Sequence, residues 1–128
     1  MEDTRDNEED MRVFKADNNI QVVVVLPKSE PTITRIKPTL DAMKAVVGGH
    51  VWHALSVEVG AGVWVDVYVH EEGSSLPFNR YVDGVELRGN ILVIPSDLIV
   101  DSDEEVNGLT DEEAARVMEL LALEAKSA

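Results

Sequence analysis

The stretch GVWVDVYVH, residues 62–70, decides the fold class, because valine alternates in it with larger or polar side chains. Successive side chains of a β-strand point to opposite faces of the sheet, so a period of two predicts a strand with its valines on one face. The other face then carries Trp64, Asp66, Tyr68 and His70. The sequence therefore predicts a sheet with one apolar face and one face of aromatic and polar side chains.

Further strands are expected on both sides of this stretch, at residues 20–26, 32–36, 50–57 and 90–94. The runs at 20–26 (IQVVVVL) and 91–94 (ILVI) are apolar on both alternating sets of positions, which is typical of strands buried on both faces. Both faces of the sheet must then be covered. One helix on each side or a second copy of the chain would serve.

Two helices are expected from their end signals. Thr39 is the predicted N-cap of the first helix, which ends at Gly48-Gly49. Thr110 and Glu113 form a predicted capping box for the second, whose apolar stripe begins at Ala114. The fold class is therefore α+β: a single domain with a mixed or mainly antiparallel sheet of about five strands and two helices.

The excess negative charge of the chain is concentrated at its two ends. The formal net charge is −14, but residues 1–10 carry −5 and residues 101–128 carry −7, which leaves −2 for residues 11–100. We expect an acidic, largely disordered N-terminal tail over residues 1–19, a domain over 20–124 and a C-terminal tail over 125–128. No clustered basic footprint supports direct binding to nucleic acid.

The residue types present exclude several kinds of site. The 128 residues contain no cysteine, which rules out disulfides, thiolate metal sites and cysteine nucleophiles. No apolar stretch reaches the roughly 18 residues of a membrane helix, and the N-terminus lacks the pattern of a signal peptide. Common nucleotide-binding, hydrolase and metalloprotease motifs are missing. We expect a cytoplasmic protein that is not an enzyme and binds no cofactor and no membrane.

The hairpin of residues 50–57 and 62–70 predicts a recognition surface. A register that keeps all the valines on one face fixes the opposing residues of the two strands. His53 then falls alone on the valine face. The pairs on the other face are His50 with His70, Trp52 with Tyr68, Ala54 with Asp66, and Ser56 with Trp64.

We interpret this second face as a site for a protein partner or for self-association, because Trp and Tyr are frequent interface anchors. A metal site would use His50 and His70 with Asp66 or Glu72, but two histidines are a weak signal and we expect no metal. The face could also be core beneath a helix. The predicted partner-binding residues are His50, Trp52, Trp64, Asp66, Tyr68 and His70.

The loop at residues 76–80 (LPFNR) offers a second candidate site. Arg80 has a planar donor fork suited to a phosphate or carboxylate, and Asn79 can support it, so both are predicted to bind a small anionic ligand. A structural alternative is an ion pair between Arg80 and Asp83 or Glu86.

Several segments together resemble the domain of unknown function 3846 family over about residues 20–124. They are residues 20–26 (IQVVVVL) with the proline-containing hairpin that follows, 46–51 (VVGGHV), 71–73 (EEG), 76–80 (LPFNR), 89–93 (GNILV) and 109–113 (LTDEE). LPFNR is the most specific of them. The resemblance implies a small accessory protein of bacteria, phages or mobile elements, with no catalytic residues to carry over.

Two functions follow as hypotheses. The first is a non-enzymatic accessory protein of a phage or mobile element that binds a macromolecular partner, interferes with a host process and resides in the host cytoplasm if phage-encoded. The alternative is a module that binds an anion or nucleotide through residues 76–80.

Overall fold

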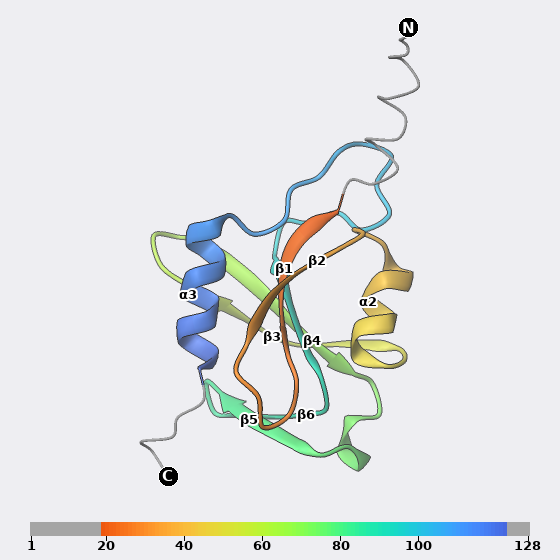
Figure 1. The fold of residues 1–128 in the computed structure, drawn as a ribbon, viewed down its shortest axis with the longest axis vertical. Coiled ribbons are helices and arrows are strands. Elements are labelled where there is room, and N and C mark those ends of the chain that lie inside the picture. The colour runs from red at the N-terminus through yellow and green to blue at the C-terminus, as the bar shows by residue number, and fades with distance from the viewer. Residues whose placement is uncertain (1–18, 123–128) are drawn as a thin grey trace, which may run out of the picture.

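The computed structural model describes residues 19–122, in which a five-stranded sheet lies between two helices (Figure 1). The expectations for residues 1–18 and 123–128 lie outside the described residues. The elements are β1 (Ile20–Val25), β2 (Thr32–Ile36), α2 (Leu40–Val47), β3 (Val51–Glu58), β4 (Trp64–His70), η1 (Gly73–Ser75), β5 (Phe78–Val82), β6 (Val85–Arg88), β7 (Ile91–Pro95) and α3 (Asp111–Leu121).

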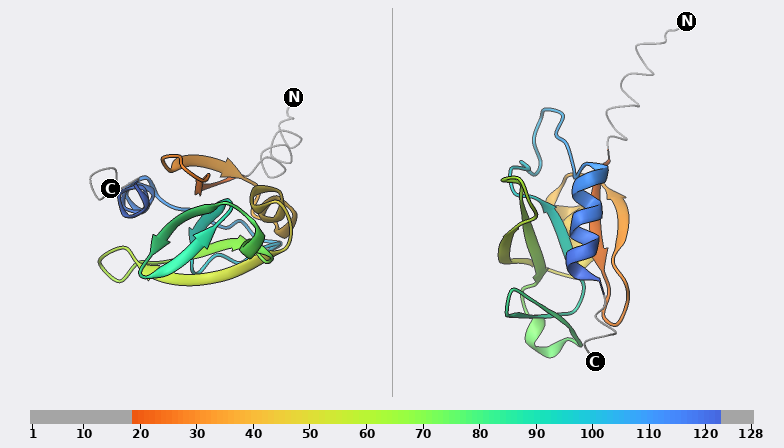
Figure 2. Two further views of the ribbon diagram at one scale, coloured as in Figure 1. Left: turned by 90° about the horizontal axis from the view of Figure 1, so that it is seen from below. Right: turned by 90° about the vertical axis from the view of Figure 1, so that its left-hand side faces the viewer.

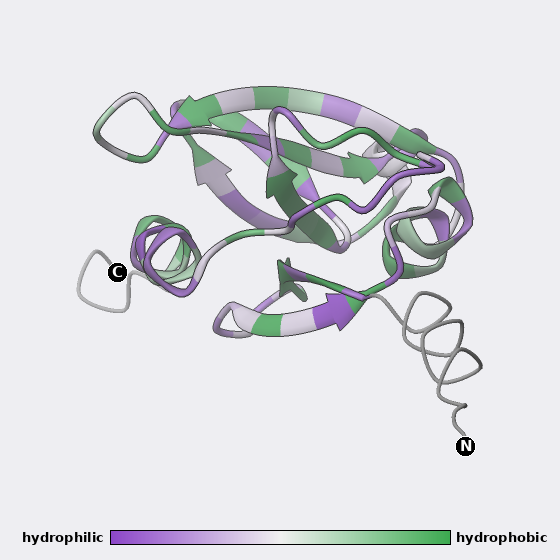
Figure 3. Cartoon of the chain, turned by 90° about the horizontal axis from the view of Figure 1, so that it is seen from above, coloured by the Kyte–Doolittle hydropathy of each residue, from purple (hydrophilic) through white to green (hydrophobic). Residues whose placement is uncertain are grey.

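The large sheet has the strand order β2-β1-β7-β4-β3, and every neighbouring pair is antiparallel. The two strands expected to be apolar on both faces, β1 and β7, lie inside this order, and all five residues of β7 are buried. Hydrophobic and hydrophilic residues are mixed along the outer strands, β2 and β3 (Figure 3). The predicted α+β class is therefore confirmed.

Each face of the sheet is covered by one helix, as the first of the two sequence alternatives required (Figure 1). On one face α3 buries Ala114, Val117 and Leu121 in a first apolar cluster that includes the valines of β4. On the other face α2 buries Met43 and Val47 in a second, smaller cluster with residues of β1 and β7.

The ends of both helices agree with the sequence. The Thr39 side chain accepts from the Ala42 amide at 3.1 Å, and the chain leaves α2 through Gly48 at φ 91°. Thr110 and Glu113 form the predicted capping box at the start of α3. Each such cap satisfies amides that would otherwise lack partners.

The predicted register of β3 against β4 is wrong. Val51 pairs with His70 and Trp52 with Val69, but beyond an irregularity between His53 and Leu55 the pairing moves on by one residue. A β-bulge of this kind places an extra residue in one strand and turns the following side chains to the other face. Ser56 therefore lies opposite Asp66.

A second hairpin was not predicted. Strands β5 and β6 form a separate two-stranded sheet, joined by Asp83 at φ 50° and Gly84 at φ 80°. Asp-Gly is a preferred pair for a tight hairpin turn with two positive φ angles, so the signal was present in the sequence. This hairpin and the loop before α3 lie at opposite ends of the large sheet (Figure 2).

The loop that follows β7 returns to the start of β1. The Leu109 amide donates to the Gln21 carbonyl at 2.8 Å, and the Gln21 side chain donates to the Leu109 carbonyl at 3.0 Å. Gly108 lies so close that a Cβ atom there would come within 2.5 Å of the Gln21 backbone. This contact holds the loop beside the beginning of β4, where the candidate site is formed.

Candidate functional site

Strand β4 presents the four residues expected on its polar face. Trp64, Asp66, Tyr68 and His70 alternate with buried valines and lie on the side of the sheet that α2 covers. They are not equivalent, because the Trp64 side chain is 51% exposed whereas the other three residues are partly buried. The predicted face therefore exists on β4, but only one end of it is an open aromatic surface.

Trp52 and His50 do not join this face. Trp52 pairs with Val69, which belongs to the cluster beneath α3, so Trp52 lies on the opposite side of the sheet from Tyr68. Its side chain is 59% exposed. His50 precedes β3, and its carbonyl accepts from the Glu71 amide at 2.8 Å. The predicted pairs of His50 with His70 and of Trp52 with Tyr68 are therefore wrong.

His70 is tied to the end of α2. Its Nδ1 atom accepts from the Glu72 amide at 2.8 Å. The ring also lies against the chain at Gly49, where an added Cβ would be 2.5 Å from His70 Nε2. His70 therefore packs the turn after β4 against the turn after α2.

Tyr68 belongs to the edge of the second apolar cluster, and its ring stands 5.3 Å from the ring of His53 at an interplanar angle of 59°. His53 is the residue opposite Tyr68, so the expectation that it lies alone on the valine face is wrong. Burial, and then the negative charge of Asp66, raises the pKa of the Tyr68 phenol above its ordinary value.

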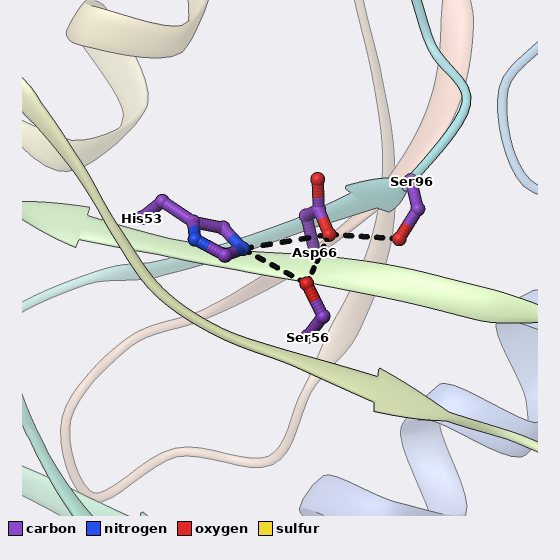
Figure 4. A network of polar contacts seen from close by, with 4 residues as sticks. All are labelled: His53, Ser56, Asp66 and Ser96. Carbon is purple, nitrogen blue, oxygen red and sulfur yellow. Dashed lines mark hydrogen bonds and ion pairs between the residues drawn. The ribbon is translucent and has the colours of Figure 1, made fainter.

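Asp66 is the centre of a polar network that also contains His53, Ser56 and Ser96 (Figure 4). Asp66 Oδ1 accepts from Ser56 Oγ at 2.6 Å and from Ser96 Oγ at 2.7 Å. His53 Nε2 lies 3.0 Å from Ser56 Oγ and 3.5 Å from Asp66 Oδ1. We call these four residues the Asp66 network; it joins β3, β4 and the residue that follows β7.

The order of contacts in the Asp66 network differs from that of a serine nucleophile. In a catalytic triad the imidazole stands between the hydroxyl and the carboxylate and removes the hydroxyl proton. Here Ser56 stands between His53 and Asp66 and donates a hydrogen bond to the carboxylate, so His53 Nε2 is the donor toward Ser56. The arrangement is that of a carboxylate held in place by two hydroxyl donors, and not that of an activated hydroxyl.

The Asp66 network borders a shallow groove of about 500 Å³, which we call the Trp64 groove. Ser96 belongs to both, because its hydroxyl reaches Asp66 while the residue lines the groove. The groove lies between the start of β4, the end of β7 and the segment before α3. The residues that line it include Trp64, Pro95, Ser96, Asp97, Gly108 and Glu113.

The sequence did not indicate the Asp66 network or the Trp64 groove. His53 and Ser56 are separated by three positions, which puts them on opposite faces of a regular strand, and they meet because of the bulge. Ser96 and Asp97 lie in a loop whose return path depends on distant contacts to β1. The acidic composition of that loop was the one available signal.

Asn79 and Arg80, predicted to bind an anion, are 5% and 9% exposed. Asn79 Nδ2 donates to the carbonyls of Val25 at 3.1 Å and Gly89 at 2.7 Å, and Asn79 Oδ1 accepts from Arg80 Nε at 2.7 Å. The amide of Asn79 therefore joins β1 to the segment before β7 and orients the guanidinium.

The Arg80 guanidinium also donates to the carbonyl oxygens of Ser29 and of Leu121, the last residue of α3. Burial lowers the pKa of Arg80, while the charge of Glu30 opposes that effect. Arg80 thus contacts main-chain carbonyls instead of the Asp83 or Glu86 side chains considered from the sequence. Its donors stabilise the junction of three segments.

Within residues 19–122, His, Asp and Glu side chains do not gather into a group of three able to hold a metal ion. None of the helices in that range is long and apolar enough to cross a bilayer.

Comparison with known proteins assigns the chain to a family. No curated protein and no solved structure matches it. A family model described as "Domain of unknown function (DUF3846)" matches residues 20–122, which includes every strand and helix of the described fold. The resemblance carried by the LPFNR and LTDEE segments is therefore confirmed, and the chain belongs to the DUF3846 family.

Proposed function

We propose that this chain is a non-enzymatic accessory protein that acts by binding a protein partner through the Trp64 groove. The observation that carries the proposal is the half-exposed Trp64 at a groove whose other wall is polar. A tryptophan in such a place combines a large apolar area with an indole donor, which is the typical composition of an interface anchor. The setting in a phage or mobile element, and interference with a host process, come from the family resemblance.

The rest of the surroundings supports recognition. The Asp66 network holds its side chains with hydrogen bonds of 2.6–3.0 Å, so the polar groups beside Trp64 are ordered before a partner arrives. Ordered polar groups reduce the entropy lost on binding. A rigid polar surface next to one exposed aromatic side chain is therefore suited to specific, reversible association.

The chain contains its own matched control for this proposal. Trp52 and Trp64 are both more than half exposed, but they lie on opposite faces of the sheet. Wild type, Trp64→Ala and Trp52→Ala are immobilised and exposed to lysate of the bacterium that carries the gene, and the retained proteins are quantified. We expect a specific protein retained by wild type and by Trp52→Ala but lost with Trp64→Ala.

The expected effect is large enough to measure. Truncating a central tryptophan anchor costs about 2 kcal/mol or more, which is about a 30-fold loss of affinity. Retention that is unchanged in Trp64→Ala, or equally reduced in Trp52→Ala, contradicts the proposal. If the partner is a second copy of the chain, wild type elutes as a larger species than Trp64→Ala in size-exclusion chromatography.

A further inference from the structure

The charged side chains that line the Trp64 groove are all negative. Asp97 and Glu113 line it, Asp66 is connected to it through Ser96, and none of its lining residues is basic. The sequence explains this, because the segment between Arg88 and Arg116 contains eight acidic residues and neither lysine nor arginine. A ligand in this groove meets a negative potential.

The three carboxylates are not equally available. Asp66 Oδ1 already accepts from two hydroxyls, and Glu113 Oε1 accepts from the Thr110 amide as part of the capping box. Asp97 is exposed, and within residues 19–122 its carboxylate has no hydrogen bond or ion pair. Asp97 is therefore the carboxylate best placed to receive a donor from outside the chain.

Trp64 supplies the second half of a cation site. The face of an indole ring attracts a cation, and it does so most favourably where the cation also has a carboxylate partner. A guanidinium satisfies both requirements, because it is planar, stacks on the indole and directs the N–H groups of its own plane toward an anion. A phosphate backbone meets repulsion in the same groove.

We propose that the Trp64 groove binds an arginine side chain of a protein partner, stacked on Trp64 and paired with Asp97. The inference rests on the proposed function and names the chemistry of the partner segment. Charge complementarity identifies this occupant, since the groove joins an exposed aromatic wall to an unpaired carboxylate. Binding weakens as salt concentration rises, because both charges lie near the surface.

The test uses a fluorescently labelled hexapeptide of alternating glycine and arginine, with a citrulline peptide as its uncharged isostere. Fluorescence anisotropy measures the affinity of both peptides for wild type, Trp64→Ala, Asp97→Asn and Trp52→Ala at constant ionic strength. We expect wild type to prefer the arginine peptide, and Trp64→Ala and Asp97→Asn each to weaken its binding about five- to tenfold. Trp52→Ala should bind as wild type does, and circular dichroism checks that all variants are folded.

The outcomes separate this inference from the proposed function. Equal binding of the arginine and citrulline peptides overturns the inference, as does an equal loss in Trp52→Ala. If lysate capture depends on Trp64 but the arginine peptide shows no preference, partner binding stands and the guanidinium chemistry is refuted. If the arginine peptide binds as expected but capture does not depend on Trp64, the cation site stands and the proposed function fails.

Discussion

Replacement of Arg80 by alanine distinguishes an anion-binding role from a structural one. The buried guanidinium donates to Asn79 Oδ1 and to the carbonyls of Ser29 and Leu121, which belong to three separate segments. If these contacts are its role, Arg80→Ala must destabilise the fold. If Arg80 is a ligand clamp, the variant should lose anion binding at little cost in stability.

The size of the effect follows from the hydrogen bonds that are lost. A hydrogen bond from a charged donor contributes about 1.5–3 kcal/mol, and a buried acceptor left without a partner costs about 1–3 kcal/mol. Because the three contacts are not additive, we expect Arg80→Ala to lower the free energy of unfolding by about 3–4 kcal/mol. For a domain of this size, that loss lowers the thermal midpoint by about 12 °C or more.

Arg88→Ala is the control, since Arg88 lies on the neighbouring strand, pairs with Glu86 at the surface and reaches a single main-chain carbonyl, that of Leu76 at 3.1 Å. An exposed pair contributes about 0.2–1 kcal/mol. Urea unfolding followed by tryptophan fluorescence gives the free energy of unfolding of each variant. An unchanged slope m shows that the same amount of surface is exposed on unfolding, so that the two values can be compared. A loss below about 1 kcal/mol for Arg80→Ala, or equal losses for the two variants, refutes the structural role. Arg80→Lys should be intermediate, because one ammonium cannot reach acceptors in several directions.

Three further predictions concern the packing around the site. Gly108→Ala forces a Cβ against the Gln21 backbone and should lower the free energy of unfolding, measured with heat or urea, by about 3 kcal/mol or more. A loss below about 1 kcal/mol contradicts the close approach. Gly49→Ala displaces the His70 ring, whose atoms can move, so about 1–2 kcal/mol is expected; a neutral variant argues against the contact. The pKa of Tyr68 is raised in the folded protein, so the neutral phenol stabilises the fold. This contribution is complete below about pH 10 and is lost as the pH rises through the pKa that Tyr68 has in the folded protein. Tyr68→Phe should therefore lose less stability than wild type as the pH rises above about 10 in thermal melts, and parallel curves contradict this.

The local patterns of the chain were enough to predict the five strands of the large sheet and both helices, but not the β5–β6 hairpin. Alternating valines identified β4, and the end signals at Thr39 and Thr110 located both helices, because side-chain period and capping act within a few residues. The register between β3 and β4 was not predictable in the same way. A bulge near Ala54 shifts it by one residue, and no turn or breaker residue in β3 marks the position.

The candidate site was harder to predict, because its members come from distant parts of the chain. Trp64 and Asp66 were assigned to one face correctly, but Ser96 reaches Asp66 from 30 residues away. Two of the three acceptors of Arg80 lie 41 and 51 residues away and are main-chain carbonyls, which every residue possesses. Side-chain composition therefore predicts charged partners more readily than it predicts contacts to the backbone.

The central position of β7 determines when the sheet can form during synthesis. The β1–β2 and β3–β4 hairpins each form from neighbouring residues, but isolated two-stranded hairpins are marginally stable in water. They are joined when β7 inserts between them, with Val93 pairing to Val23 on one side and to Val67 on the other. During synthesis on the ribosome, both hairpins remain unpaired on their inner edges until β7 has emerged. These exposed edges can form wrong strand pairs or be bound by chaperones and cleaved by proteases. Chain termination before Ile91 would thus leave the two hairpins of the large sheet unjoined, so the integrity of the sheet depends on the synthesis of β7.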